Sequence, residues 1–181
     1  MTSEADRRLL LQMARAAILA RLQGAPALPV AEPVGPVGHG VFVTVRTRKE
    51  LRGCVGHVGG PAPLVPLVAR CAVNACTSDP RFAPIEASEL VDLSIELSVL
   101  GPLEAIQGPQ EIEVGVHGLL VERGRRRGLL LPQVAVEYRW DRQQFLEHAC
   151  RKAGLPHDAW RDGAALWRFE ADVFGEPDRL S

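Results

Sequence analysis

Apolar and polar residues alternate most regularly between residues 91 and 99. Every odd position there is Val, Leu or Ile, and every even position is Asp, Ser or Glu. A period of two predicts a half-buried β-strand with one polar face. Residues 41–46 form a shorter β-branched run, and the polar stretch 47–50 separates it from an apolar return at 51–56. This pattern predicts two more strands that are joined by a polar turn.

Helical spacing of apolar residues predicts helices in three parts of the chain. The first helix is expected from residue 3 to about residue 22, the second from 63 to a point before Pro80, and the third from 141 to 154. The first and the third begin with capping-box sequences. The second opens on a proline, which is tolerated in the first turn of a helix.

Further strands are predicted at 114–121, 129–131 and 166–171, the first two as a hairpin across a basic turn. Helices and strands therefore alternate without the regular rhythm of parallel βαβ units. The predicted fold class is α+β, with a mixed or antiparallel sheet and packed helices. We expect residues 1–181 to form a single domain, in which the Pro- and Gly-rich stretch 24–40 is a surface connection.

Composition is that of a soluble globular protein, because 46% of the residues are hydrophobic, 24% are charged and the formal net charge is −1. This charge gives no global reason to expect binding to nucleic acid or to an anionic membrane. No apolar run approaches the roughly 20 residues that span a bilayer, and the acidic N-terminus differs from a secretory signal. We therefore expect a cytoplasmic protein. Three of its four cysteines, Cys71, Cys76 and Cys150, lie in apolar helical stretches and are predicted to be inert.

The strongest candidate site is the stretch 51–56, in which Cys54 stands between Gly53 and Gly56 and follows Arg52 closely. Glycines allow another group to approach the backbone, and a neighbouring cation favours thiolate over thiol. One interpretation is therefore an activated thiol near a strand end or a bulge. The other is a small buried residue in a tightly packed strand, because free cysteine is among the most buried residue types.

Four further polar residues are candidates for the same site. Asp79 and Arg81 flank Pro80, where they either stabilise a corner or bind an anionic group through the guanidinium. His117 is flanked by glycines in an apolar stretch, and it is either a core histidine bonded to the main chain or a general acid–base. Gln133 follows a predicted strand end, where it either orients a ligand or satisfies backbone groups.

Other chemistries have weaker support in the sequence. Cys54 and His57 form half of a metal-site pattern, but a second half-site is missing, so no metal is predicted. The arginines between 123 and 127 are typical of a solvated hairpin tip, and no aromatic residues accompany them for binding nucleic acid. Phosphate-loop, dinucleotide, zinc-protease and serine-hydrolase motifs are absent from the sequence, and no cofactor is predicted.

In their order and spacing these residues resemble the AMMECR domain, which is called AmmeMemoRadiSam system protein A in prokaryotes. The resemblance covers nearly the whole chain. It implies an α+β fold with a larger and a smaller subdomain and a cleft where the motif residues gather, although no catalytic activity is firmly established for the family. It also implies association with a Memo-like protein, related in fold to extradiol dioxygenases, and with a radical SAM enzyme. The matching stretches are 42–44, 51–56, 79–82 with Pro84, 89–90, 98–100, 114–119, 130–134, Trp140 and 152–155.

Together these observations predict a site around Cys54 that binds a small anionic ligand or carries out thiol-dependent chemistry. Arg52 and Arg81 would hold the anionic group. Asp79 would orient Arg81, and His117 would exchange protons. The rival hypothesis is an adaptor that binds a Memo-like or radical SAM partner through the same surface, with Cys54 purely structural. The sequence leaves open whether the protein is an enzyme.

Overall fold

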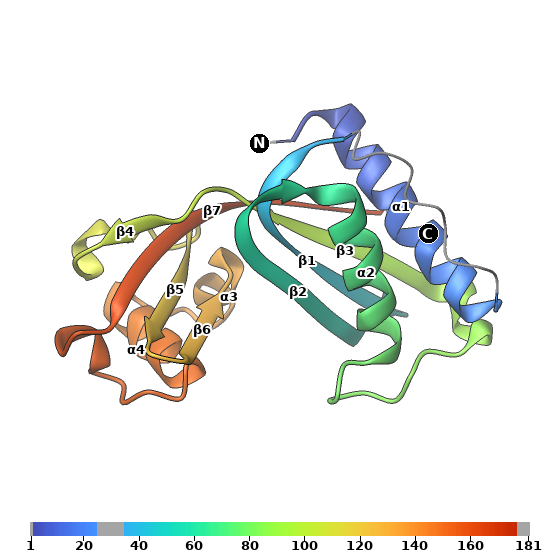
Figure 1. Cartoon of the computed structure of the whole chain (residues 1–181). Coiled ribbons are helices and arrows are strands. Elements are labelled where there is room, and N and C mark those ends of the chain that lie inside the picture. The colour runs from blue at the N-terminus through green and yellow to red at the C-terminus, as the bar shows by residue number, and fades with distance from the viewer. Residues whose placement is uncertain (1, 25–34, 177–181) are drawn as a thin grey trace. The chain divides into compact units, whose positions relative to one another are not determined.

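The computed structural model describes residues 2–24 and 35–176 (Figure 1). The chain divides into two compact units: unit 1 comprises Met1–Leu100 and Asp172–Ser181, and unit 2 comprises Gly101–Ala171. Helices and antiparallel strand pairs occur together, which confirms the α+β class, whereas the single domain stays a prediction. In the described residues no helix is both long and apolar enough to cross a membrane.

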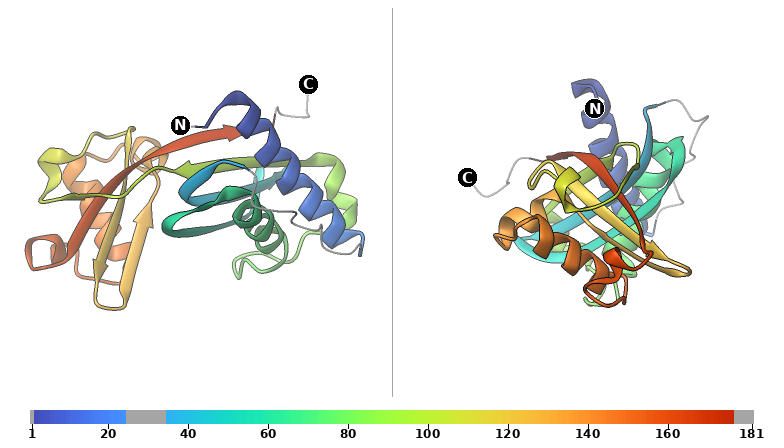
Figure 2. Two further views of the ribbon diagram at one scale, coloured as in Figure 1. Left: turned by 45° about the horizontal axis from the view of Figure 1, so that its top comes forward. Right: turned by 90° about the vertical axis from the view of Figure 1, so that its left-hand side faces the viewer.

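Unit 1 is an antiparallel sheet with two helices. In chain order its main elements are α1 (Glu4–Leu22), β1 (Val37–Thr47), β2 (Glu50–Pro63), α2 (Leu64–Thr77) and β3 (Leu93–Leu100). A short 3₁₀ helix, η1 (Ala87–Asp92), precedes β3, and the last residues of β7 (Ala165–Gly175) complete the sheet. The strand order is β2-β1-β3-β7, so β2 lies at an edge. Figures 1 and 2 show α1 and α2 side by side, in agreement with their contacts.

The core of unit 1 forms where α1 and α2 pack on the sheet. The predicted alternation of β3 places its apolar residues in this core, and β1 contributes its own alternate valines. Helix α1 begins with the predicted capping box, in which the Ser3 hydroxyl accepts the Asp6 N–H and the Asp6 carboxylate accepts the Ser3 N–H. The strand residues of unit 1 in this core with no exposed surface are Val41, Val43, Val45, Leu93 and Leu97.

Unit 2 is a second antiparallel arrangement. Its elements are β4 (Glu104–Ile106), η2 (Pro109–Glu111), β5 (His117–Arg123), β6 (Arg126–Leu130), α3 (Pro132–Glu137), α4 (Arg142–Lys152) and η3 (Ala159–Arg161), with the first part of β7. Strand β7 pairs with β4 and β5, and β5 pairs with β6. Helix α4 packs on this sheet through Phe145, Leu146 and Ala149, which are completely buried.

Several predicted element boundaries change in the structure. Strand β1 covers Val37–Thr47 and not 41–46, β2 covers Glu50–Pro63 and not 51–56, and β6 covers Arg126–Leu130 and not 129–131. The strand predicted at 114–121 begins only at His117, because Gly115 has a φ of 88° and the preceding residues turn. Strand β7 extends past the predicted 166–171 at both ends. Of the connection predicted at 24–40, residues 25–34 lie outside the described residues, and β1 already begins at Val37.

Candidate functional site

Strand β2 carries a bulge two residues before Cys54. Val45 of β1 pairs with Gly53, and its neighbour Arg46 pairs with Leu51, so Arg52 is the extra residue. Cys54 therefore lies close to a bulge, although within the strand and not at its end. A Cβ on Gly53 would lie 1.9 Å from the Ala75 carbonyl oxygen, so only glycine allows α2 to pack this closely against the strand.

The main chain of Cys54 points away from β1, at the free edge of the sheet. Its N–H donates to Asp79 Oδ2 at 2.9 Å, and its carbonyl accepts from Arg81 Nη2 at 3.4 Å. On the facing strand Thr44 is its partner, and the Thr44 hydroxyl lies 3.3 Å from the sulfur. Both polar groups of an edge residue, which would otherwise be open to pairing with another strand, are thus satisfied from one short segment.

Asp79 and Arg81 form a two-pronged ion pair, which we call the Asp79–Arg81 clamp. Arg81 Nη2 and Nε donate to the two carboxylate oxygens at 2.7 and 3.0 Å, and the Arg81 N–H adds a bond of 3.1 Å. These side-chain bonds from Arg81 hold the pKa of Asp79 far below its usual range; the N–H groups of Cys54 and Arg81 lower it further, and burial opposes the shift. The Asp79 side chain is only 4% exposed, whereas that of Arg81 is 55% exposed.

Arg52 has a carboxylate partner that the sequence analysis missed. Its Nε and Nη2 donate to Glu89 of η1 at 2.9 and 3.1 Å, and this bonding lowers the pKa of Glu89. The Glu86-x-x-Glu89 spacing, a capping-box pattern at the start of η1, is the local signal that places Glu89. The predicted role of Arg52 in holding an anion stays a prediction, and the guanidinium would have to share its donors with Glu89 to fulfil it.

The four cysteines differ in burial, and all lie in the described part of the chain. Cys71, Cys76 and Cys150 are buried, as predicted, whereas Cys54 is half-buried. Burial raises the pKa of Cys76 to about 12, and it also raises the pKa of Cys71 and of Cys150. These three thiols are therefore poor nucleophiles near neutral pH.

The remaining predicted residues are placed as follows. Gly56 allows the Phe42 ring to lie over β2, because a Cβ there would come within 2.3 Å of that ring. His117 and Gln133 belong to unit 2, so their convergence with Cys54 stays a prediction. The Oε1 atom of Gln133 is buried without a hydrogen-bond partner in the described residues.

His57 is exposed, and the described residues contain no group of three or more metal-ligating side chains.

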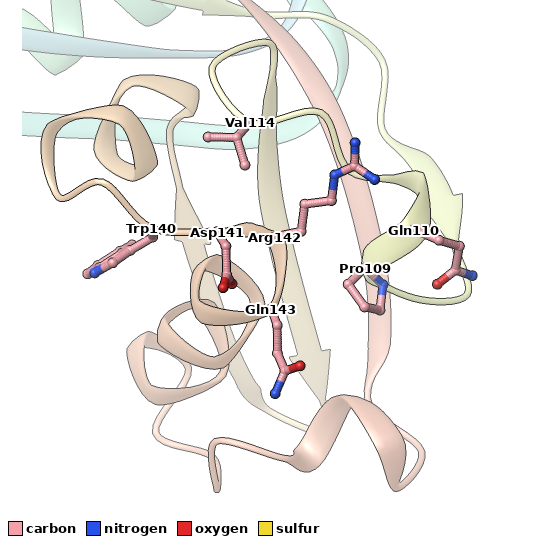
Figure 3. A pocket seen from close by; sticks show the side chains of 7 residues that line it. All are labelled: Pro109, Gln110, Val114, Trp140, Asp141, Arg142 and Gln143. Carbon is pink, nitrogen blue, oxygen red and sulfur yellow. The ribbon is translucent and has the colours of Figure 1, made fainter.

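Unit 2 contains a shallow pocket that the sequence did not reveal, with a volume of about 600 Å³. Figure 3 shows the side chains that line it, which come from the segments 109–114 and 140–143. One of them, Trp140, stacks on His148 with ring centroids 3.7 Å apart and on Tyr138 at 4.9 Å. The lining residues are Pro109, Gln110, Val114, Trp140, Asp141, Arg142 and Gln143.

Comparison with known proteins gives consistent matches. A family model described as AMMECR1 matches residues 11–174. A protein of Methanothermobacter thermautotrophicus is 42% identical over 184 residues, which cover 96% of this chain and 96% of that protein. Protein TK0174 of Thermococcus kodakarensis is 46% identical over 151 residues, which cover 76% of this chain and 72% of that protein. The crystal structure of the uncharacterized protein PH0010 from Pyrococcus horikoshii matches with a TM-score of 0.85 and 38% identity, over 94% of this chain and 91% of that chain.

Proposed function

The chain belongs to the AMMECR1 family, and from this premise we propose that unit 1 binds a small anionic molecule beside a reactive thiol, that of Cys54. The observation that carries the proposal is the Asp79–Arg81 clamp. It fixes the main chain of the one half-buried cysteine and brings an exposed guanidinium to the same residue.

The guanidinium of Arg81 has N–H donors that are available to bind a ligand. Arginine offers five N–H groups in a planar fork. Arg81 uses Nε and Nη2 for Asp79 and for the Cys54 carbonyl, and Nη1 has no acceptor among the residues that the structure describes. Because Asp79 holds the fork in place, an incoming carboxylate or phosphate would meet a donor that is already oriented.

The chemistry proposed is displacement: the Cys54 thiol loses its proton to water, the thiolate forms a bond to an electrophilic carbon of the bound molecule, and the bond from that carbon to a leaving group breaks, the leaving group taking the electron pair. The thiolate is the nucleophilic form of cysteine, so a cation that recruits an anionic substrate next to it serves both binding and reaction. Asp79 bonds to the main-chain N–H of Cys54 and takes no part in the displacement itself. It positions Arg81 and the strand that carries the sulfur.

Alkylation with two reagents tests this proposal. Iodoacetamide is neutral and iodoacetate is anionic, and both lose iodide to an attacking thiolate. We expect Cys54 to react before the three buried cysteines, and its iodoacetate-to-iodoacetamide rate ratio to exceed that of free cysteine. Arg81→Met should lower this ratio about 5-fold, which corresponds to roughly 1 kcal/mol. The control Arg48→Met removes an exposed cation elsewhere in unit 1 and should leave the ratio unchanged. Equal reactivity of Cys54 and Cys150 would contradict the proposal.

A second candidate function, the adaptor, is favoured by a different observation. Unit 2 exposes Val116, Val136 and Tyr138, with 41%, 56% and 65% of their surfaces accessible. Exposed apolar side chains of this kind often mark a protein-binding surface. An adaptor would use them to bind a Memo-like protein or a radical SAM enzyme.

Calorimetry with a purified Memo-like protein separates the two functions. If the protein is an adaptor, Val136→Asp should weaken binding at least 10-fold, and Cys54→Ser should leave it unchanged. The matched control is Val91→Asp in unit 1, at a valine that is 70% exposed. Absence of binding by the unmodified chain would remove support for the adaptor and would leave the thiol proposal untouched.

A further inference from the structure

His117 is tied to Glu113 by two hydrogen bonds. The His117 N–H donates to the Glu113 carbonyl at 2.9 Å, and the Glu113 N–H donates to the imidazole Nδ1 at 3.0 Å. Between them Gly115 adopts a φ of 88°, a left-handed conformation that closes the loop. The orientation of the ring is therefore fixed by the main chain on both sides.

These bonds determine which ring nitrogen carries the proton. A backbone N–H can only donate, so the Nδ1 atom that it faces must act as an acceptor. The neutral imidazole then carries its proton on Nε2. In the described residues no acceptor bonds to this Nε2–H, and the side chain is half-buried and not enclosed.

We infer that His117 is a fixed hydrogen-bond donor, which binds a carbonyl or carboxylate oxygen of a ligand through Nε2–H and does not serve as a general base. To act as a general base, the ring would have to take a proton on Nδ1 and give up its bond to Glu113. The inference differs from the predicted role in proton exchange, and it holds whether or not Cys54 is reactive.

The surroundings of His117 favour such a donor. Val116 directly precedes it and is exposed. The exposed Val136 of α3 lies close to the same loop, since a Cβ added to Gly115 would be 3.2 Å from a methyl carbon of Val136. A hydrogen bond made next to apolar surface competes less with water and is correspondingly stronger. The expected ligand therefore combines an oxygen acceptor with an apolar body.

Nitrogen NMR of the imidazole tests the tautomer directly. We expect the His117 signals, assigned by their loss in His117→Gln, to show Nε2–H and an unprotonated Nδ1 at neutral pH. Glu113→Pro removes the donor to Nδ1, and the Nδ1–H form should then become populated. Ile112 tolerates this change because its φ and ψ, −95° and 131°, suit a residue before proline. Glu113→Ala keeps the amide and should leave the tautomer unchanged. A dominant Nδ1–H form in the unmodified protein would overturn the inference.

Two probes test the ligand class in the same spectra. Sodium acetate supplies a carboxylate and N-methylacetamide supplies an amide carbonyl, and at least one of them should shift the Nε2–H resonance in a saturable way. A shift with acetate indicates a carboxylate ligand, and a shift with N-methylacetamide indicates a carbonyl ligand. Sodium chloride at equal ionic strength is the control. If neither probe shifts the resonance more than the control, the donor site is refuted.

A matched pair of variants tests the exclusion of proton transfer. His117→Gln keeps an N–H donor near the position of Nε2, and His117→Asn keeps an acceptor near Nδ1. In both variants we expect the Cys54 alkylation rate to stay within about 2-fold of the unmodified protein. A fall of more than 10-fold in both would make His117 the base that activates the thiol, and the inference would be wrong. Failure of Cys54 to react at all would refute the proposed function while leaving the NMR results to decide this inference.

Discussion

Unit 1 and unit 2 hold their polar side chains in different ways. In unit 1, several ion pairs hold carboxylates that are at least three-quarters buried. In unit 2, the pairs between distant elements, Arg168–Glu104 and Arg123–Asp162, leave their carboxylates 59% and 94% exposed, and main-chain bonds and stacked rings orient other polar side chains. The pairs of unit 1 that join distant elements include Arg52–Glu89, Arg7–Asp172 and Arg15–Glu176, and the local Asp79–Arg81 pair is bonded to Cys54 of β2. The contrasting features of unit 2 are the Glu113–His117 loop and the Tyr138–Trp140–His148 stack.

This difference shows why structure and candidate chemistry are hard to separate in unit 1. The Asp79–Arg81 clamp satisfies the main chain of Cys54 at the edge of β2, which a fold needs, and it also orients a cation at the Cys54 carbonyl, which the proposed reaction would need. A substitution at Asp79 therefore changes both. In unit 2, His117 is oriented by backbone alone, so its side chain can be exchanged with less risk to the fold.

The largest effect is expected from breaking the clamp. Asp79→Ala leaves the N–H groups of Cys54 and Arg81 without acceptors, and it should lower the free energy of unfolding by about 2–3 kcal/mol. The loss stays below that for a wholly buried ion pair because the Arg81 side chain, 55% exposed, can turn to water. Urea unfolding measures the change. Asp92→Ala, which breaks the exposed pair with Arg48, is the control and should cost less than about 1 kcal/mol.

Close packing gives the next largest effect, again in unit 1. A Cβ at position 53 would meet the Ala75 carbonyl at 1.9 Å, so Gly53→Ala must push α2 away from β2. We expect a loss of about 1–3 kcal/mol, as for other overpacked sites. Gly60→Ala on the same strand is the matched control, because nothing lies within 4 Å of the Cβ that it adds. Equal stabilities of the two variants in urea would show that β2 and α2 are less tightly joined than described.

Acidification should act on unit 1 through its carboxylates. Asp79, Glu89 and Asp172, all in this unit, have pKa values below the usual range. Burial alone would raise the pKa of Asp172, but hydrogen bonds from Thr2 and Arg7 lower it by more. A carboxyl whose pKa is lower in the folded state stabilises it fully above its unfolded pKa, about 4, and loses that contribution as pH falls through the folded value. We therefore expect stability to decline progressively below about pH 5.

Two measurements check this pH dependence. Urea unfolding between pH 7 and pH 3 should give a smaller decline for Asp79→Asn than for the unmodified protein, because one of the linked carboxyls is gone. Hydrogen exchange of the backbone amides should show that, as the pH is lowered, the amides of unit 1 lose their protection from exchange at a higher pH than those of unit 2. The expectation would be wrong if both units lost amide-exchange protection at the same pH and if the unfolding free energy of Asp79→Asn fell with pH as steeply as that of the unmodified protein.

Local patterns were sufficient to predict much of the fold, since capping boxes and alternation depend on residues near one another in sequence. The capping box of α1 and the strand β3 are examples. The pairing of Arg52 with Glu89 was missed because 37 positions separate the two residues, and the bulge that makes Arg52 the extra residue of β2 was not placed at this residue by the sequence. The start of β5 was misplaced because Gly115, a residue that fits either a strand or a turn, takes a positive φ.

The smallest expected effect concerns backbone strain in unit 2. Arg139, between the stacked Tyr138 and Trp140, has a φ of 54°, a conformation that costs an L-residue about 1 kcal/mol. Arg139→Gly should therefore raise the free energy of unfolding by about 0.5 kcal/mol, the relief of strain being partly offset by the greater freedom of glycine when unfolded. Arg151→Gly is the control, and it should change stability in the opposite direction. Because Arg151 lies in helix α4, where glycine is unfavourable, this change should lower the free energy of unfolding by about 1 kcal/mol. If Arg139→Gly also loosens the ring stack, Trp140 fluorescence will change, and the strained arginine then serves to hold the rings together. Unit 2 would in that case hold these rings with one strained main-chain residue, where unit 1 uses ion pairs with buried carboxylates.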